Sequence, residues 1–198
     1  MVDIVGVTAS EIKNQALFYL GFVDEVDFAV TTNPTVKKVN RIYDTCLTNA
    51  LTSHRWRFAI KRDNLTATKA DATEDWKYKY LYTLPTDMLS YNASYTDEYY
   101  NCVIRNFETN QTYLNCDETT AYVMYTALVE ETAFPQYFIN YFQYKLALDL
   151  CFNLTGDTEL MKILAEQATQ ASIRAKNTDS RQNPARTISA SPFTRVRG

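Results

Sequence analysis

The sequence has little of what common catalytic and nucleotide-binding motifs require. It holds one histidine, His54, and four glycines in 198 residues. An acyl-transfer triad needs a histidine beside a positioned nucleophile, and no such motif surrounds His54, which we interpret as a partner for the C-terminal dipole of a helix. The glycines are too few and too widely separated for a phosphate-binding loop or a dinucleotide fingerprint. We therefore expect no catalytic residues and no cofactor.

Long apolar runs and paired cysteines are missing as well. No run approaches the roughly 18 apolar residues of a membrane span, and residues 1–30 hold no basic segment followed by an apolar one. We therefore predict a soluble protein that is made in the cytoplasm and does not enter a membrane. The cysteines are scattered without a CxxC pair, which indicates free thiols in a reducing compartment. They are Cys46, Cys102, Cys116 and Cys151.

Carboxylates are plentiful, but their spacing does not indicate a metal site. Asp24, Glu25 and Asp27 lack the ligand spacing and the glycine of a calcium loop, so we expect a solvated turn and no metal. Four acidic doublets occur, at 74–75, 97–98, 117–118 and 130–131. Adjacent side chains of a strand point to opposite faces, so a doublet is not itself the carboxyl pair of a glycoside hydrolase. A peptidoglycan hydrolase remains the alternative function.

Aromatic residues are abundant, with 15 Tyr and 10 Phe. Tyrosine suits surfaces that are buried against partners, although a Tyr-rich β-sheet explains the composition equally well. Residues 76–80 interleave aromatics with lysine, as platforms for single-stranded nucleic acid do. The aromatics share one face of the expected strand, which favours core-facing rings. The net charge of −3 also differs from the basic composition that is typical of a nucleic-acid binder.

Apolar residues at three- and four-residue spacing predict four helices, over about 9–20, 34–54, 135–154 and 158–176. Thr8 or Ser10 caps the first, and Asn33-Pro34 starts the second. Gly156 closes the third, so the last two helices form an antiparallel hairpin.

The apolar period changes to two at Trp56 and returns to helical spacing at Phe134. Strands are expected near 56–61 and 76–82, and short apolar segments follow at 88–95, 99–104, 112–116 and 121–128. The fold class is therefore α+β: an antiparallel bundle of about four helices with an inserted β-meander of about five strands and an extended C-terminal arm. Residues 1–180 are expected to form one domain, with helices in 8–55 and 134–176 and the β part in 56–130.

The C-terminal segment differs in composition from the rest of the chain. Residues 177–198 hold four arginines against one aspartate, Asp179, and are expected to be disordered in isolation. We assign residues 181–198 to a basic docking arm, in which Phe193 after Pro192 is the apolar anchor. The arginines that would pair with carboxylates of a partner are Arg181, Arg186, Arg195 and Arg197.

The order of these motifs resembles the tail tubular protein A family, the head-to-tail adaptors of short-tailed bacteriophages, including the crAss-like ones. The resemblance covers residues 8–180. It depends on a first helix ending at Leu20-Gly21 and a long helix leading into RWRF at 55–58. The segment WKYKYLYTLPTDML at 76–89, Phe134-Pro135 and the final hairpin with LTGD at 154–157 complete the pattern.

This resemblance implies a structural protein of the virion and no enzyme. Twelve copies would form a ring between the portal protein and the tail, with helices in the ring wall, the β part facing the tail nozzle or further ring proteins, and the C-terminal arm docked on the portal. Genomic DNA would pass through the ring without specific binding. We expect tyrosines at the ring and nozzle interfaces, namely Tyr99, Tyr100, Tyr113, Tyr137 and Tyr144.

Overall fold

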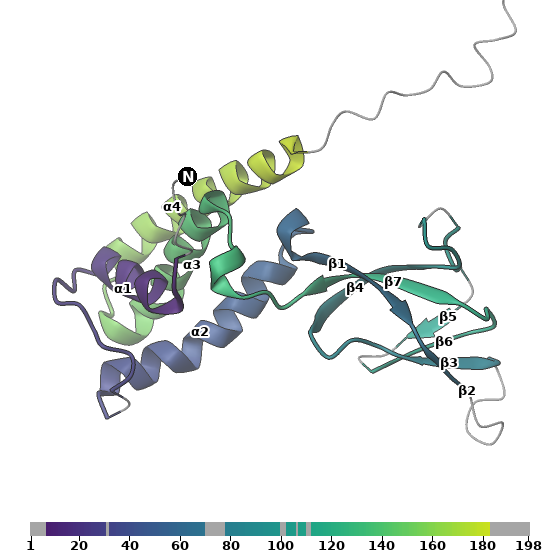
Figure 1. The fold of residues 1–198 in the computed structure, drawn as a ribbon. Helices are drawn as coiled ribbons and strands as arrows, with labels where there is room; N and C mark the ends of the chain where they lie inside the picture. Colours follow the sequence, from purple (N-terminus) through teal and green to yellow (C-terminus); the bar gives the residue numbers. More distant parts are fainter. Residues whose placement is uncertain are drawn as a thin grey trace, which may run out of the picture.

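The computed structural model describes residues 7–30, 32–69, 78–99, 102–105, 107–109 and 112–182. These residues form a helical lobe and a β lobe that lie end to end (Figure 1). The α+β class with four α-helices is as the sequence predicts. The chain passes between the lobes twice, from α2 into β1 and from β7 back into α3.

Local capping signals set the bounds of the helices. The helices are α1 (Ala9–Tyr19), α2 (Pro34–Thr52), α3 (Gln136–Leu154) and α4 (Thr158–Arg181). Thr8 and Glu11 form a capping box at the start of α1, and the Asn33 side chain accepts from the backbone N–H of Thr35 at the start of α2. Gly156 has φ +66°, the left-handed conformation expected where α3 ends.

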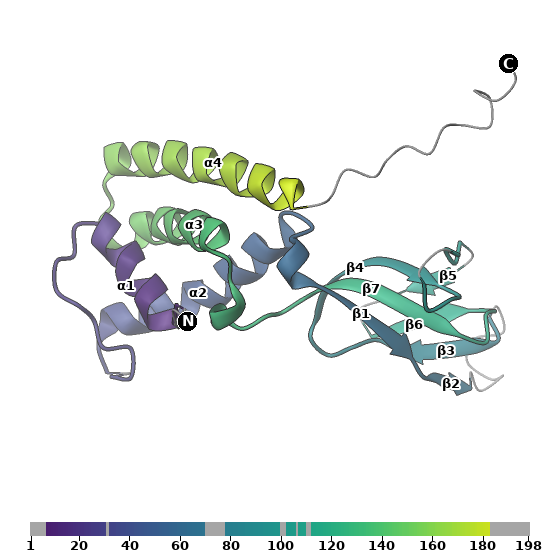
Figure 2. The same cartoon turned by 45° about the horizontal axis from the view of Figure 1, so that its top comes forward.

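The central element of the helical lobe is α3. In Figure 2, α4 covers one side of α3, and α1 and α2 cover the other. Because α3 is enclosed in this way, Phe138, Phe142, Leu146 and Leu150 are fully buried and form the centre of one apolar core.

The described part of the β lobe contains seven short strands in two antiparallel sheets. One sheet has the order β1-β7-β4 and the other β2-β3-β6-β5. A second apolar core includes Leu65, Tyr82, Leu114 and Val123, which come from both sheets. The strands are β1 (Ile60–Leu65), β2 (Ala67–Lys69), β3 (Tyr80–Thr83), β4 (Met88–Tyr95), β5 (Phe107–Thr109), β6 (Tyr113–Cys116) and β7 (Ala121–Ala127).

The predicted five-stranded meander is wrong. In a meander each strand pairs with the next, whereas here the first strand pairs with the last, from Ile60 opposite Thr126 to Leu65 opposite Ala121. The short strands β2 and β5 were not predicted, and residues 102–104 contribute only a bridge between Val103 and Tyr95. Turn residues indicate where strands end, but burial of both inner sheet faces decides which strands pair.

The strand predicted from Trp56 is also wrong over its first residues. Arg57–Ala59 form a single 3₁₀ turn, and β1 begins only at Ile60. The Trp56 side chain is fully buried in the helical core, with its ring centroid 5.1 Å from that of Phe138. Its alternation with Phe58 imitates a strand because both rings pack on the same helix, α3.

The last helix is longer than predicted and ends at Arg181, the first residue of the expected arm. Asn177 to Arg181 are helical and Asp179 is buried, in contrast to the predicted disordered tail. Five arm residues lie outside the described part of the chain, namely Arg186, Pro192, Phe193, Arg195 and Arg197. Trp76 of the aromatic run also lies outside it, whereas Tyr78 and Tyr82 are buried, as core-facing rings should be.

Candidate interaction surfaces

A buried carboxylate joins three separate segments where the two lobes meet. Asp179 of α4 accepts a hydrogen bond from the Tyr137 hydroxyl at 2.8 Å and another from the Arg57 backbone N–H at 3.1 Å. His54 Nε2 lies 3.6 Å from its second oxygen. Burial, followed by the hydrogen bond to Asp179, raises the pKa of Tyr137. We call these four residues the junction cluster, and it explains why α4 continues past Ala175.

The junction cluster borders an open cleft of about 1010 Å³ that arginine side chains line. Arg55, Arg57 and Arg62 lie there with His54, which makes the cleft basic. Ser180 lies in the same cleft, but its hydroxyl donates to the Lys176 carbonyl at 2.8 Å, so it is not held against His54 as a triad nucleophile would be. The position of His54 just past α2 agrees with a dipole partner, but its carboxylate partner was not predicted.

Two of the predicted interface tyrosines lie in one groove. Tyr137 and Tyr144 of α3 line a groove of about 360 Å³ with Tyr19 of α1 and Gln170 and Arg174 of α4. The rings of Tyr19 and Tyr144 stack at 4.6 Å with an interplanar angle of 7°. The groove has the aromatic and amide character that is common at protein interfaces. A role in an interface stays a prediction.

Two more of the predicted tyrosines, Tyr99 and Tyr113, belong to the β lobe. Tyr99 is 74% exposed, and Tyr113 is 38% exposed at the start of β6. Tyr100 lies outside the described residues. The four described tyrosines therefore do not form one surface, because the two lobes separate them.

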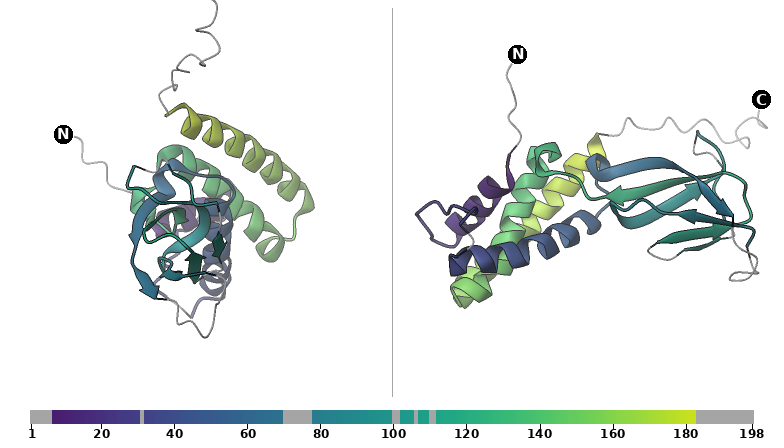
Figure 3. Two further views of the ribbon diagram at one scale, coloured as in Figure 1. Left: turned by 90° about the vertical axis from the view of Figure 1, so that its right-hand side faces the viewer. Right: turned by 60° about the horizontal axis from the view of Figure 1, so that its bottom comes forward.

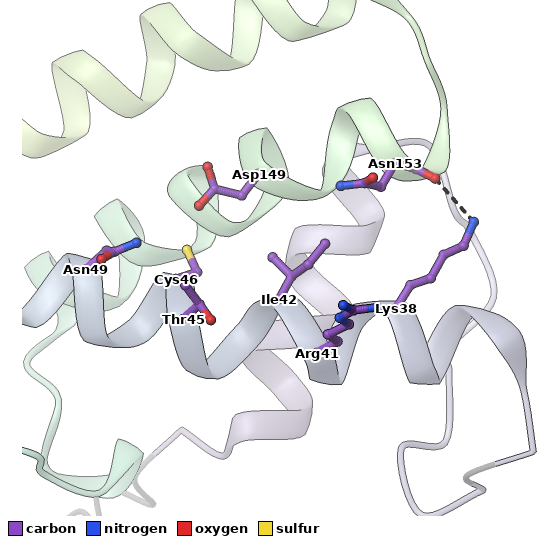
Figure 4. Close-up of a pocket in the computed structure, with 8 residues that line it drawn as sticks. All are labelled: Lys38, Arg41, Ile42, Thr45, Cys46, Asn49, Asp149 and Asn153. Atoms are coloured by element: carbon purple, nitrogen blue, oxygen red, sulfur yellow. Dashed lines mark hydrogen bonds between the residues drawn. The ribbon is translucent and has the colours of Figure 1, made fainter.

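A second groove, between α2 and α3, was not predicted (Figure 4). It has a volume of about 620 Å³ and is lined by Lys38, Arg41, Ile42, Thr45, Cys46, Asn49, Asp149 and Asn153. Burial, followed by the charge of Asp149, raises the pKa of the Cys46 thiol, so the thiol is a neutral part of the groove. The Lys38 ammonium donates to the Asn153 carbonyl at 3.3 Å. Hydrophobic spacing placed Cys46 on the inner side of α2, but it gave no sign that a groove would open there.

The acidic doublets within the described residues have structural roles. Asp97 accepts from the backbone N–H of Cys102, Asp117 from that of Lys79, and Glu131 from the Tyr43 hydroxyl. Asp27 accepts from the Ala29 backbone N–H, as expected of a turn. Across the described ranges, no three His, Cys, Asp or Glu side chains are placed to hold a metal ion.

None of the described helices is both long and apolar enough to cross a membrane. A comparison with protein-family models gives no match to this chain, and a comparison with curated proteins gives none either.

Proposed function

We propose that this chain is a head-to-tail adaptor of a short-tailed bacteriophage. In this proposal, copies form a ring between the portal and the tail, and the genome leaves through its channel. The observation that carries the proposal is the exposure of large apolar side chains on both lobes, which neighbouring copies and tail proteins would cover in a ring. They are Phe18, Val23, Val30, Phe152, Ile163 and Ile173 on the helical lobe and Tyr99, Val103, Tyr113 and Leu128 on the β lobe.

The elongated shape supports this assignment. A subunit of a ring needs lateral surfaces for its neighbours and two ends for the proteins above and below. Two lobes with separate cores supply such ends (Figure 1). Twelve helices placed side by side at about 10 Å have a circumference of about 120 Å and a diameter of about 38 Å between axes, which leaves a channel for duplex DNA.

The charge of the chain suits a channel that DNA only crosses. The full sequence has a net charge of −3, and the basic residues of its C-terminal segment make the remainder more acidic still. Like charge on the wall weakly repels phosphates, whereas a basic wall would retain the genome.

The C-terminal residues 183–198 are the proposed portal arm. Native mass spectrometry of the full chain, alone and with the portal protein of the same virion, tests the ring and the complex. A chain ending at Gln182 should keep its fold, because the described contacts of α4 lie before that point, and should no longer bind portal. Normal portal affinity of this shortened chain would show that the arm does not hold this protein to the portal. A full chain that stays monomeric with portal present would refute the adaptor proposal.

A virion-associated peptidoglycan hydrolase is the second candidate. One observation favours it: the Tyr125 hydroxyl lies 3.0 Å from an oxygen of Asp63 and 3.1 Å from one of Asp87, so two carboxyl groups converge. Burial raises the pKa of Asp87, but hydrogen bonds from Lys61 and Tyr125 outweigh it, so the pKa is lowered. A general acid needs the opposite shift. Zymography on cell walls, with Asp63→Asn and Asp87→Asn variants, decides between the candidates, and a cleared band that these substitutions abolish would establish the hydrolase.

A further inference from the structure

We infer that neighbouring copies of this chain join through two different surfaces of the helical lobe, an acidic knob on α1 and the groove between α2 and α3. The knob is made of Phe18, Val23, Asp24 and Glu25, and Lys38 and Arg41 flank the groove. The inference rests on the proposed ring, and it names the contact that builds the ring.

The knob presents apolar side chains next to carboxylates. Phe18 is 60% exposed and Val23 is 86% exposed, and the exposed carboxylates Asp24 and Glu25 follow Val23 directly in the chain. The segment after α1 turns back at Gly21, which has φ +89°. The Asn14 side chain then holds it by accepting from the Val26 N–H at 3.0 Å and donating to the Val26 carbonyl at 3.2 Å. The knob is therefore fixed in place on α1.

The groove offers the complementary chemistry. Ile42 gives it an apolar side, and Lys38 and Arg41 lie next to Ile42 along α2 (Figure 4). Among the described residues, no salt bridge involves Lys38 or Arg41. Asp149, the carboxylate in the groove, is paired with Lys145 at 2.6 Å. The groove therefore keeps an uncompensated positive charge that suits Asp24 and Glu25 of a neighbour.

The two surfaces lie on opposite sides of the lobe. Figure 3 (right) shows α1 and α2 side by side with α3 in the helical lobe. Lys13 of α1 contacts Asn40 of α2 at 2.9 Å, and at about 100° per residue Lys38 and Thr45 lie far around α2 from Asn40. On α1, Phe18 projects away from the buried Ile12 and Ala16.

Opposite placement selects the type of assembly. A two-fold dimer joins one surface to the same surface, whereas two different surfaces on opposite sides join copies head to tail and allow a ring to close. A phosphate of DNA would pair with Lys38 and Arg41, but it would leave the apolar side chain of Ile42 uncovered. The knob of another copy satisfies both the charges and the apolar wall.

Charge-reversal variants test the contact by sedimentation velocity and native mass spectrometry, with portal present where the wild-type chain requires it. Lys38→Glu with Arg41→Glu reverses the groove, and Asp24→Lys with Glu25→Lys reverses the knob. Each double variant should weaken self-association by about 100-fold or more, because like charges then face each other. Circular dichroism should show both variants folded, since all four side chains are exposed.

Mixing the two double variants gives the decisive measurement. In a 1:1 mixture each normal knob meets a normal groove and each reversed knob meets a reversed groove, so alternating rings should form where neither variant assembles alone. The matched controls carry the same charge changes on exposed residues of the β lobe. They are Lys79→Glu with Arg105→Glu and Glu98→Lys with Glu118→Lys, and both should assemble as the wild type does.

The outcomes separate the two proposals. A wild-type ring that the groove variant leaves unchanged overturns the inference and leaves the adaptor proposal standing. Equal loss in the controls, or failure of the mixture to assemble, also overturns the inference, as does a groove variant that loses DNA binding but still forms rings. A wild-type chain that is monomeric with portal present overturns both.

Discussion

Replacing Asp179 by alanine should destabilise the helical lobe more than any exposed substitution in α4. The side chain is 1% exposed and accepts hydrogen bonds from Tyr137 and from the Arg57 backbone N–H. Without it two part-buried donors lose a charged acceptor, at about 1.5–3 kcal/mol each. The substitution also stabilises α4 by about 1 kcal/mol, because alanine favours helix and a negative charge is removed from the last turns of α4. The net loss should be about 2–5 kcal/mol.

Trp56 supplies the assay. Its ring centroid lies 4.9 Å from that of His54, so its fluorescence reports on the junction during urea or thermal unfolding. Replacing Trp76 by phenylalanine leaves Trp56 as the single tryptophan. A loss of 2–5 kcal/mol corresponds to a midpoint about 4–20 °C lower for a chain of this size. Asp179→Asn should cost less because an acceptor oxygen remains, and Glu166→Ala on the exposed face of α4 should stay within about 0.5 kcal/mol.

A double-mutant cycle identifies the cause. Tyr137→Phe should be costly in the wild type and nearly neutral beside Asp179→Ala, where its hydroxyl already lacks the carboxylate acceptor. The reasoning fails if Asp179→Ala costs less than about 0.5 kcal/mol, or if the two substitutions are additive.

Three further predictions concern single groups. Gly156→Ala should lower the free energy of unfolding in urea by about 1 kcal/mol. The cost comes solely from the φ of +66°, because no heavy atom lies within 4 Å of the added Cβ. An unchanged urea midpoint would contradict this prediction. In thiol titration of the native protein, Cys102 should be the only cysteine that reacts, and it should react slowly because the hydrogen bond to Asp97 raises its pKa. Fast labelling of Cys46, Cys116 or Cys151 before unfolding would disprove their burial. Burial raises the pKa of Tyr82 to about 12, above about 10 in the unfolded chain, so its contribution to stability is complete below pH 10 and is lost as pH rises from 10 to 12. Absorbance at 295 nm should therefore show phenolate formation coinciding with alkaline unfolding, and ionisation of every tyrosine in the native state would contradict it.

The helices could be predicted because their signals are local. Thr8, Asn33-Pro34 and Gly156 act on backbone groups a few residues away, and each lies where a helix begins or ends. Three strands, β4, β6 and β7, were also expected in the right places, since alternation and flanking turns are visible over short windows.

What the sequence did not indicate depends on residues far apart in the chain. Asp179 contacts His54, Arg57 and Tyr137, which lie more than forty positions before it in the sequence. No short sequence window around Asp179 therefore contains its partners. The pairing of β1 with β7 and the groove between α2 and α3 arise in the same way. The tyrosines could be proposed for interfaces from composition, but only packing of α1, α3 and α4 showed that Tyr137 and Tyr144 line one groove.

The double passage of the chain between the lobes has a consequence during synthesis. The β lobe is one continuous segment, from Ile60 to Ala127, so every strand of its core is synthesised before α3. The apolar faces of α1 and α2 emerge first but are covered only by α3 and α4, which come last. The middle of the chain can therefore fold before its beginning, and α1 and α2 are the nascent segment in need of chaperone protection.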